Sequence, residues 1–165
     1  MIGRVQATIE VRADVADVFA ALVDLPSQDR WMLGTRLFAL RGDSDVPQVG
    51  SKIAALTGVA GVGVLDTMIV TVFDPPHRWE TEHTGNAFKG VGIFLVEPAA
   101  GGARVTWAEE IRLPLGIVGG FGWKAAKPLV RWGLAVSLRR LARGVVAGSL
   151  PVAGRQQPAR GKTIR

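Results

Sequence analysis

The feature of this sequence that most restricts its fold is a succession of six strand-like segments between residues 35 and 114. Within them apolar and polar residues tend to alternate, which is the period expected of a strand with one buried face. The segments are separated by short breaks rich in the residues that turns require: GDSDVPQVG, GVAG, DPP, TGNA and PAAGG. Because breaks this short cannot hold a crossover helix, they favour antiparallel hairpins.

A further strand and two short helices are expected before this series. Residues 3–11 alternate as another strand. The stretch ADVADVFAALVDL then spaces its apolar residues as a helix does, and Asp14 stands where a capping residue is expected. The following SQDRWM predicts a second short helix that turns Trp31 and Met32 inward.

From about Val118 to Gly148 the apolar period becomes helical, and this long helix is the only element able to cover the sheet. Two adjoining sets of residues predict its core-facing side. The first set is Phe121, Ala125, Leu129, Trp132 and Val136, and the second, which widens it, is Trp123, Val130, Leu134, Leu138, Leu141 and Val145. The last residues have two prolines, four basic residues and little to bury. We therefore expect one domain over residues 1–148 and a basic disordered tail over 149–165.

Composition removes several classes of chemistry and of location. The 165-residue chain has no cysteine and no tyrosine, so thiolate ligands, a thiol nucleophile and a phenolic acid are excluded. The start lacks the apolar run of a signal peptide. The longest uncharged apolar run near the end, LPLGIVGGFGW, is shorter than the about 20 residues that a bilayer-spanning helix needs. A cytoplasmic location is the expectation.

The basic character of the chain is concentrated at its C-terminal end. Ten of the twenty Lys and Arg residues lie from Lys124 onward, a segment without Asp or Glu. Two interpretations stay open: a solvated helix face, or a peripheral contact with an anionic membrane, helped by Phe121 and Trp123 nearby. The residues of that contact are Lys124, Lys127, Arg131, Arg139, Arg140 and Arg143. Nucleic acid is not expected, because the strands offer no exposed aromatic platform with interleaved basic residues. Monomer and homodimer are both compatible with the sequence.

Four segments, in this order, carry a resemblance to a known family: RADVADVFAALVDLPSQDRWM, QVGSKI, VTVFDPPHRWETEHTG and GGARVTWAEEI. Over about residues 3–148 the chain resembles the helix-grip superfamily, also called the START or SRPBCC fold, and within it the polyketide cyclase/dehydrase-like group. The resemblance implies an α+β fold in which a curved antiparallel sheet of about seven strands wraps around the long C-terminal helix. It also implies an internal cavity for lipids, polyketides, sterols or other apolar molecules. It implies no single chemistry, since members include cyclases, lipid carriers, receptors and co-chaperones.

Alternation predicts which side chains of the segment RWETEH point inward. Trp79 is its only large apolar residue, so the face that Trp79 shares with Thr81 and His83 is the inner one. Glu80 and Glu82 then point to water.

The same argument applies to ARVTWAEEIRLP. It turns Trp107, Glu109 and Ile111 inward and Glu110 outward, although a one-residue bulge would exchange the two glutamates. The inward ionisable residues are therefore His83 and Glu109. If the strands follow the family's order, one strand lies between theirs, and a strand spacing of about 4.8 Å places the two residues roughly 10 Å apart. That separation excludes a direct hydrogen bond but allows both to contact one ligand. The orientation of Asp66, flanked by apolar residues, stays undecided.

These residues predict a binding site for an apolar or aromatic small molecule. Its expected lining is Trp79, Thr81, His83, Trp107, Glu109, Ile111, Phe121 and Leu129. The main interpretation is a carrier or sequestering protein. The first alternative is a cyclase- or dehydratase-type enzyme with His83 and Glu109 as acid–base groups. The second is an interaction module that uses the basic helix while side chains fill the hollow.

The two ionisable residues also have a purely structural interpretation, in which each lies at a strand end in contact with solvent or bonds to the backbone. No metal is expected, because alternation separates Glu82 from His83 and the chain has only one other histidine, His77. No cofactor is expected either.

Overall fold

The computed structural model describes residues 1–40, 45–59, 62–86, 89–112 and 116–153, with side chains except those of residues 59 and 116–121. The residues after 153, most of the expected tail, therefore lie outside the described part. Within that part no helix combines the length and the apolar character needed to cross a bilayer.

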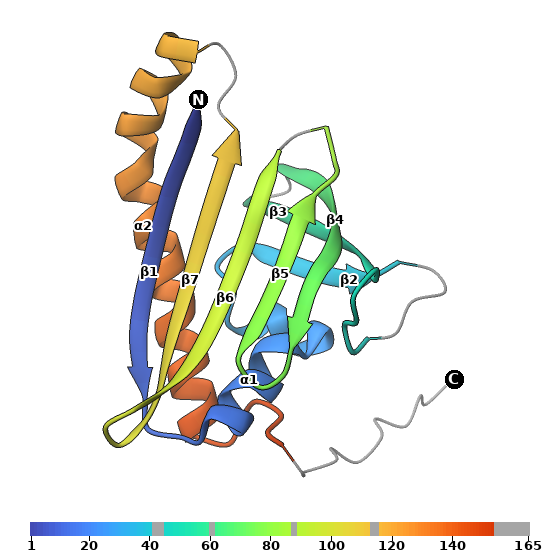
Figure 1. Cartoon of the computed structure of the whole chain (residues 1–165), viewed down its shortest axis with the longest axis vertical. Coiled ribbons are helices and arrows are strands. Elements are labelled where there is room, and N and C mark those ends of the chain that lie inside the picture. The colour runs from blue at the N-terminus through green and yellow to red at the C-terminus, as the bar shows by residue number, and fades with distance from the viewer. Residues whose placement is uncertain (41–44, 60–61, 87–88, 113–115, 154–165) are drawn as a thin grey trace.

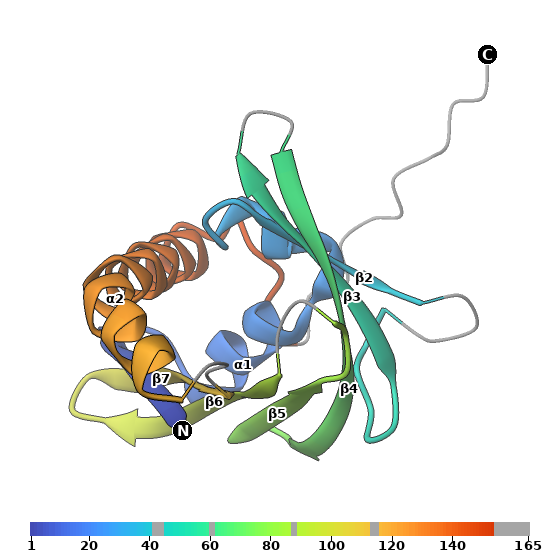
Figure 2. The same cartoon turned by 90° about the horizontal axis from the view of Figure 1, so that it is seen from above.

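Seven antiparallel strands form one curved sheet, in the order β1-β7-β6-β5-β4-β3-β2 (Figure 1). The strands are β1 (Ile2–Val11), β2 (Thr35–Ala39), β3 (Lys52–Val59), β4 (Val62–Asp74), β5 (Arg78–His83), β6 (Gly90–Ala99) and β7 (Gly102–Arg112). From β2 to β7 each strand pairs with the next along the chain, as the short breaks predicted, and β1 closes the order beside β7. Figure 2 shows how the sheet bends, so that β2, β3 and β4 stand at a steep angle to β6, β7 and β1.

Two short helices, α1 (Val15–Val23) and η1 (Leu25–Arg30), follow β1, and the long helix α2 (Gly116–Val146) follows β7. The fold is therefore the expected helix grip. Asp14 occupies the N-cap of α1, but its side chain makes no capping hydrogen bond. Asp24 caps η1 instead by accepting a hydrogen bond from the backbone N–H of Ser27. After η1, Trp31 and Met32 are buried as predicted.

Only one of the two predicted apolar sets on α2 faces the core. Its buried residues are Leu134, Leu138, Leu141 and Val145. Near its start Trp123 packs on β1, where a Cβ added to Gly3 would come within 2.7 Å of the indole. By contrast Leu129 and Trp132 are 69% and 55% exposed, so the prediction that their set packs on the sheet is wrong. The error has a simple cause: both faces of the helix are apolar here, and packing decides between them.

A cluster of four aromatic side chains fills the middle of the inner face. Trp79 stacks on Phe94 with 5.3 Å between ring centroids, and Phe94 lies 4.8 Å from Trp107. Trp31 meets Phe94 and Trp107 edge-on, at 6.4 and 6.1 Å. All four side chains are buried, so this cluster forms an aromatic floor on the inner face of the sheet.

Candidate functional site

The candidate site lies on the inner face of β5, β6 and β7, one row beyond the aromatic floor. Thr81 on β5 and Glu109 on β7 are both directly opposite Gly92 of β6. In the following row His83 and Ile111 are both opposite Gly90. Because side chains alternate along a strand, β6 places glycine at two successive inner positions, and its inner surface there is bare backbone.

This gap in β6 allows residues of two strands that do not pair to meet. A Cβ added to Gly92 would lie 3.2 Å from both Thr81 Oγ1 and Glu109 Oε1, so the Glu109 carboxylate already occupies part of the space above the glycine. From there Glu109 Oε2 lies 3.5 Å from Nε2 of His83. The expected separation of about 10 Å is therefore wrong. That estimate used only the spacing between the strand backbones. It did not include the length of the Glu109 side chain, which extends over Gly92 toward His83.

Asp66 of β4 is the residue that alternation could not place. Its carboxylate is buried, and Oδ2 lies 2.5 Å from Nδ1 of His83. Met68, two residues along β4, is the direct partner of His83, which brings Asp66 to the histidine on the same face. A charged residue in an otherwise apolar strand was the available signal, since a buried carboxylate requires a polar partner.

The fourth member of the group is Trp107, whose indole Nε1–H donates a hydrogen bond of 2.7 Å to Glu109 Oε1. Asp66, His83, Glu109 and Trp107 thus form a continuous polar network that spans the sheet from β4 to β7. The strand β7 pairs regularly with both neighbours, so alternation holds through Glu109. Glu110 accordingly points outward, 3.5 Å from the Arg4 guanidinium.

Burial and charge act in opposite directions on His83. Burial of the imidazole lowers its pKa, but hydrogen bonds to Glu109 and Asp66, and the charges of these carboxylates, outweigh that effect and raise the pKa above 6.5. His83 is therefore cationic over a wider pH range than a free histidine. The side chains of His83 and Glu109 keep 15% and 16% of their surface exposed, whereas Asp66 keeps 5%. The pair formed by His83 Nε2 and Glu109 Oε2 is the accessible end of the network.

The other expected site residues fall into three groups. Trp79 and Thr81 are buried on the inner face beside the network, and Ile111 is half-buried there. Leu129 is exposed on α2 rather than turned into the core, and the side chain of Phe121 lies outside the described residues. On the outer face of β5, Glu82 is exposed and Glu80 pairs with Arg78.

Carboxylates and histidines are also the side chains that would ligate a metal ion in a chain without cysteine. In the described part of the chain no group of three or more His, Asp or Glu side chains is arranged to hold a metal ion. The second histidine, His77, contacts the carbonyl oxygen of Val96 through Nδ1 at 3.0 Å and takes no part in the network.

Comparisons with solved structures agree with this architecture. The protein TTHA0849 from Thermus thermophilus is 19% identical with a TM-score of 0.73, covering 89% of this chain and 99% of that one. Ms6760 from Mycobacterium smegmatis is 15% identical with a TM-score of 0.65, covering 88% and 92%. The Aha1 dimer from Colwellia psychrerythraea is 18% identical with a TM-score of 0.55, covering 87% and 96%. At these identities the likeness shows the shared fold.

The family comparison is more specific. No curated protein matches the chain. A family model described as polyketide cyclase / dehydrase and lipid transport matches residues 3–146, nearly the whole of the ordered fold. The chain therefore belongs to the polyketide cyclase/dehydrase and lipid transport family, within the SRPBCC superfamily.

Proposed function

We propose that the protein binds a small, largely apolar molecule on the inner face of β5, β6 and β7, with one polar group held by His83 and Glu109. The observation that carries this proposal is the polar network placed over the bare backbone of Gly90 and Gly92. The side chains of His83 and Glu109 keep 15% and 16% of their surface exposed, so this pair is the part of the network that a ligand can reach. The family's description, which includes lipid transport, supports a ligand of this class.

The chemistry of the network defines what the ligand's polar group must offer. Asp66 engages Nδ1 of His83, and Nε2 of His83 faces Glu109 Oε2, so a ligand's polar group would insert between these two side chains and accept a hydrogen bond from Nε2–H. Trp107 engages Oε1 of Glu109, so the inserted group would donate its hydrogen bond to Oε2, the oxygen that faces His83. With 3.5 Å between these two atoms, the best fit is a ligand that carries an acceptor and a donor close together, such as a carbonyl beside a hydroxyl. The aromatic floor then receives its apolar part.

Acid–base catalysis is the second candidate, and the close approach of His83 to Glu109 favours it. In that case His83 Nε2 donates its proton to a carbonyl or leaving hydroxyl oxygen, and Glu109 Oε2 accepts a proton from the neighbouring carbon or hydroxyl. Asp66 would act as a positioning residue that fixes the orientation of the imidazole. Such a pair suits a cyclisation or a dehydration.

Binding is tested with Nile red, an uncharged apolar dye, and with unlabelled fatty acids and polycyclic phenols as competitors. We expect saturable fluorescence that these competitors displace and that Glu109→Gln weakens. The control His77→Gln changes the other histidine, outside the network, and should bind as the unmodified protein does. A chain that binds no dye and shows no retained small molecule in native mass spectrometry would contradict the proposal.

Once a ligand is known, carrier and enzyme are separated by turnover. An enzyme should lose roughly 10²- to 10⁴-fold of its rate in His83→Gln and Glu109→Gln, because each removes one proton-transfer group. A carrier should show weaker binding in both variants and no conversion of the ligand in any form of the protein.

A further inference from the structure

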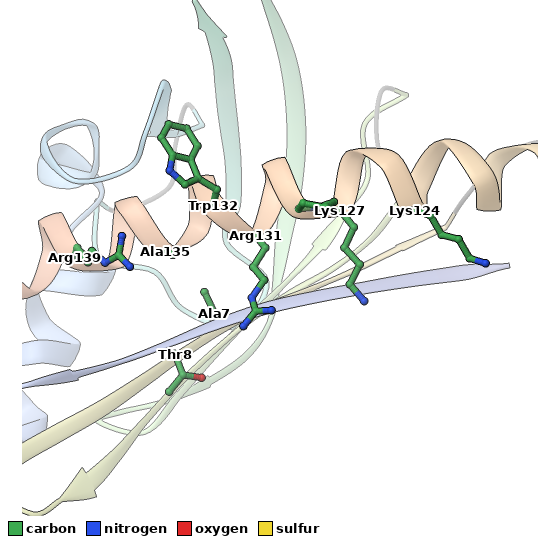
Figure 3. A pocket seen from close by; sticks show the side chains of 9 residues that line it. Ala7, Thr8, Lys124, Lys127, Arg131, Trp132, Ala135 and Arg139 are labelled. Atoms are coloured by element: carbon green, nitrogen blue, oxygen red, sulfur yellow. The ribbon is translucent and has the colours of Figure 1, made fainter.

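The exposed side of α2 carries an apolar feature that the fold does not use. Leu129 and Trp132 are 69% and 55% exposed. Because they lie three residues apart in the helix, they are neighbours on its surface. Figure 3 shows the Trp132 side chain directed away from β1, the strand that α2 packs against. Large apolar side chains exposed together in this way often mark a contact surface.

Basic side chains lie along the same helix, and in Figure 3 those of Lys127 and Arg131 extend toward β1, on the other side of the helix from Trp132. Lys124, Lys127, Arg131 and Arg139 line, together with Trp132, a groove of about 610 Å³ between α2 and β1 (Figure 3). Arg140 and Arg143 are exposed farther along the helix. The sequence of α2 contains no acidic residue.

Two acidic residues on the neighbouring strands pair with arginines outside α2. Glu10 on β1 pairs with Arg104, and Glu110 on β7 pairs with Arg4. Among the residues that the structure describes, no ion pair involves Lys127, Arg131 or Arg139. The helix therefore carries a concentrated positive charge next to an exposed apolar pair.

We propose that this face of α2 docks on an anionic lipid bilayer, with Trp132 and Leu129 in the headgroup region and the basic residues against lipid phosphates. An exposed indole and leucine flanked by Lys and Arg are what an interfacial helix requires, and each cation near an anionic surface adds to the attraction. The sequence suggested Trp123 as an apolar anchor, but its indole is packed on Gly3. Trp132 takes that role in the folded protein.

A nucleic acid is the other polyanion that such a charge could attract. It is less suited to this face, because an exposed leucine gains nothing from a phosphate backbone, whereas it gains free energy by leaving water for the acyl boundary. The two partners differ in a measurable way: membrane binding depends on both the charge and the apolar pair, and nucleic-acid binding depends mainly on the charge.

The first test is co-sedimentation of the full chain with vesicles of phosphatidylcholine, with and without phosphatidylserine. We expect binding to the anionic vesicles only, and a decrease as salt is raised because screening weakens charge attraction. Equal binding to neutral vesicles, or no binding to either, would overturn the proposal. So would tighter binding to a DNA duplex that is unaffected by Leu129→Ser.

Matched variants locate the surface. Arg131→Glu should weaken vesicle binding about fivefold or more, whereas Arg12→Glu, at an exposed arginine just after β1, should change it little. Leu129→Ser should weaken binding, and Leu65→Ser should not, although Leu65 on β4 is 62% exposed. Equal losses in the two serine variants would assign the contact to apolar exposure in general and reject α2 as the docking face.

Depth of insertion gives an independent measurement. Brominated lipids should quench part of the tryptophan fluorescence of the bound protein, and Trp132→Leu should lose that quenching while it still sediments with anionic vesicles. Unchanged quenching in Trp132→Leu would place a different tryptophan at the membrane and refute the proposed orientation. None of these measurements uses the inner-face ligand site, so their outcome is separate from that of the proposed function.

Discussion

Glu109 lies 3.5 Å from His83 although their strands do not pair, because the intervening strand places Gly92 between them. This relationship links the protonation of the histidine to the position of one carboxylate. It also makes the site sensitive to a single added methyl group at position 92. Both consequences can be measured, as can the packing that supports the site.

The pKa of His83 should lie above 6.5 in the folded protein, because Glu109 and Asp66 together favour the charged imidazole. The chain has only two histidines, so a titration of imidazole resonances by NMR resolves both, and His83→Gln assigns them. Asp66→Asn and Glu109→Gln should each lower the pKa of His83. Asp29→Asn, which removes a surface carboxylate paired with Arg36, is the control and should leave it unchanged.

The stability of the fold should depend on pH through the same residue. A pKa that is higher in the folded than in the unfolded chain contributes its full stabilisation below about pH 6.5, the unfolded value. That contribution is lost as the pH rises through the folded-state pKa of His83. Urea unfolding at a series of pH values should show that the free-energy difference between the unmodified protein and His83→Gln shrinks toward alkaline pH. A difference that grows with pH would contradict the raised pKa.

Gly92→Ala should reduce ligand binding without unfolding the protein. The new methyl group would lie 3.2 Å from Thr81 Oγ1 and Glu109 Oε1, so the carboxylate has to shift from its present position beside His83. We expect about a fivefold loss of Nile red affinity, which corresponds to about 1 kcal/mol or one hydrogen bond. The control is Gly133→Ala on α2, where an added Cβ meets nothing within 4 Å and binding should be unchanged.

Trp107→Phe should lower the free energy of unfolding by about 1.5–3 kcal/mol, the usual contribution of a hydrogen bond to a charged group. It removes the indole N–H that holds Glu109 but keeps an aromatic ring in the floor. Trp132→Phe makes the same exchange at an exposed position and should cost less than about 0.5 kcal/mol. Equal destabilisation in chemical denaturation would show that the hydrogen bond to Glu109 contributes little.

Phe94→Ala should destabilise the fold by about 3–5 kcal/mol, since it opens a cavity at the centre of the aromatic floor. The ring contacts Trp31, Trp79 and Trp107, and all three indoles would lose packing at once. Phe38→Ala on β2 removes a ring that is exposed and should have a much smaller effect on thermal unfolding.

Local signals in the sequence, namely alternation of side chains and short breaks, were sufficient to predict antiparallel pairing and the inner faces of β5 and β7. The helix-grip fold itself was predicted through the resemblance to a known family, which the family match confirms. The orientation of His83 and of Glu109 followed from the same alternation, because neither strand contains a bulge at these positions.

Features that depend on contacts between distant segments were not predicted. Asp66 could not be placed because its strand is apolar on both faces, and β4 shifts register between Val70 and Val72. The short distance between His83 and Glu109 was not predicted, because it was estimated from strand spacing alone. That estimate did not consider that Gly92 leaves room for the Glu109 side chain to reach across β6. On α2 both candidate faces are apolar, so only packing against β1 could show that Leu129 is the exposed one.

The two glycines of β6 also limit how the site can diverge. A Cβ at Gly90 would collide with the carbonyl oxygen of Glu110, so that position tolerates no larger residue. At Gly92 the nearest atoms to an added Cβ are side-chain oxygens of Thr81 and Glu109 rather than backbone. In the proposed ligand site, a substitution at position 92 can therefore only add bulk next to His83 and Glu109, because glycine is already the smallest residue. Position 92 is thus the place on β6 where a single substitution would make the proposed site smaller without a backbone clash.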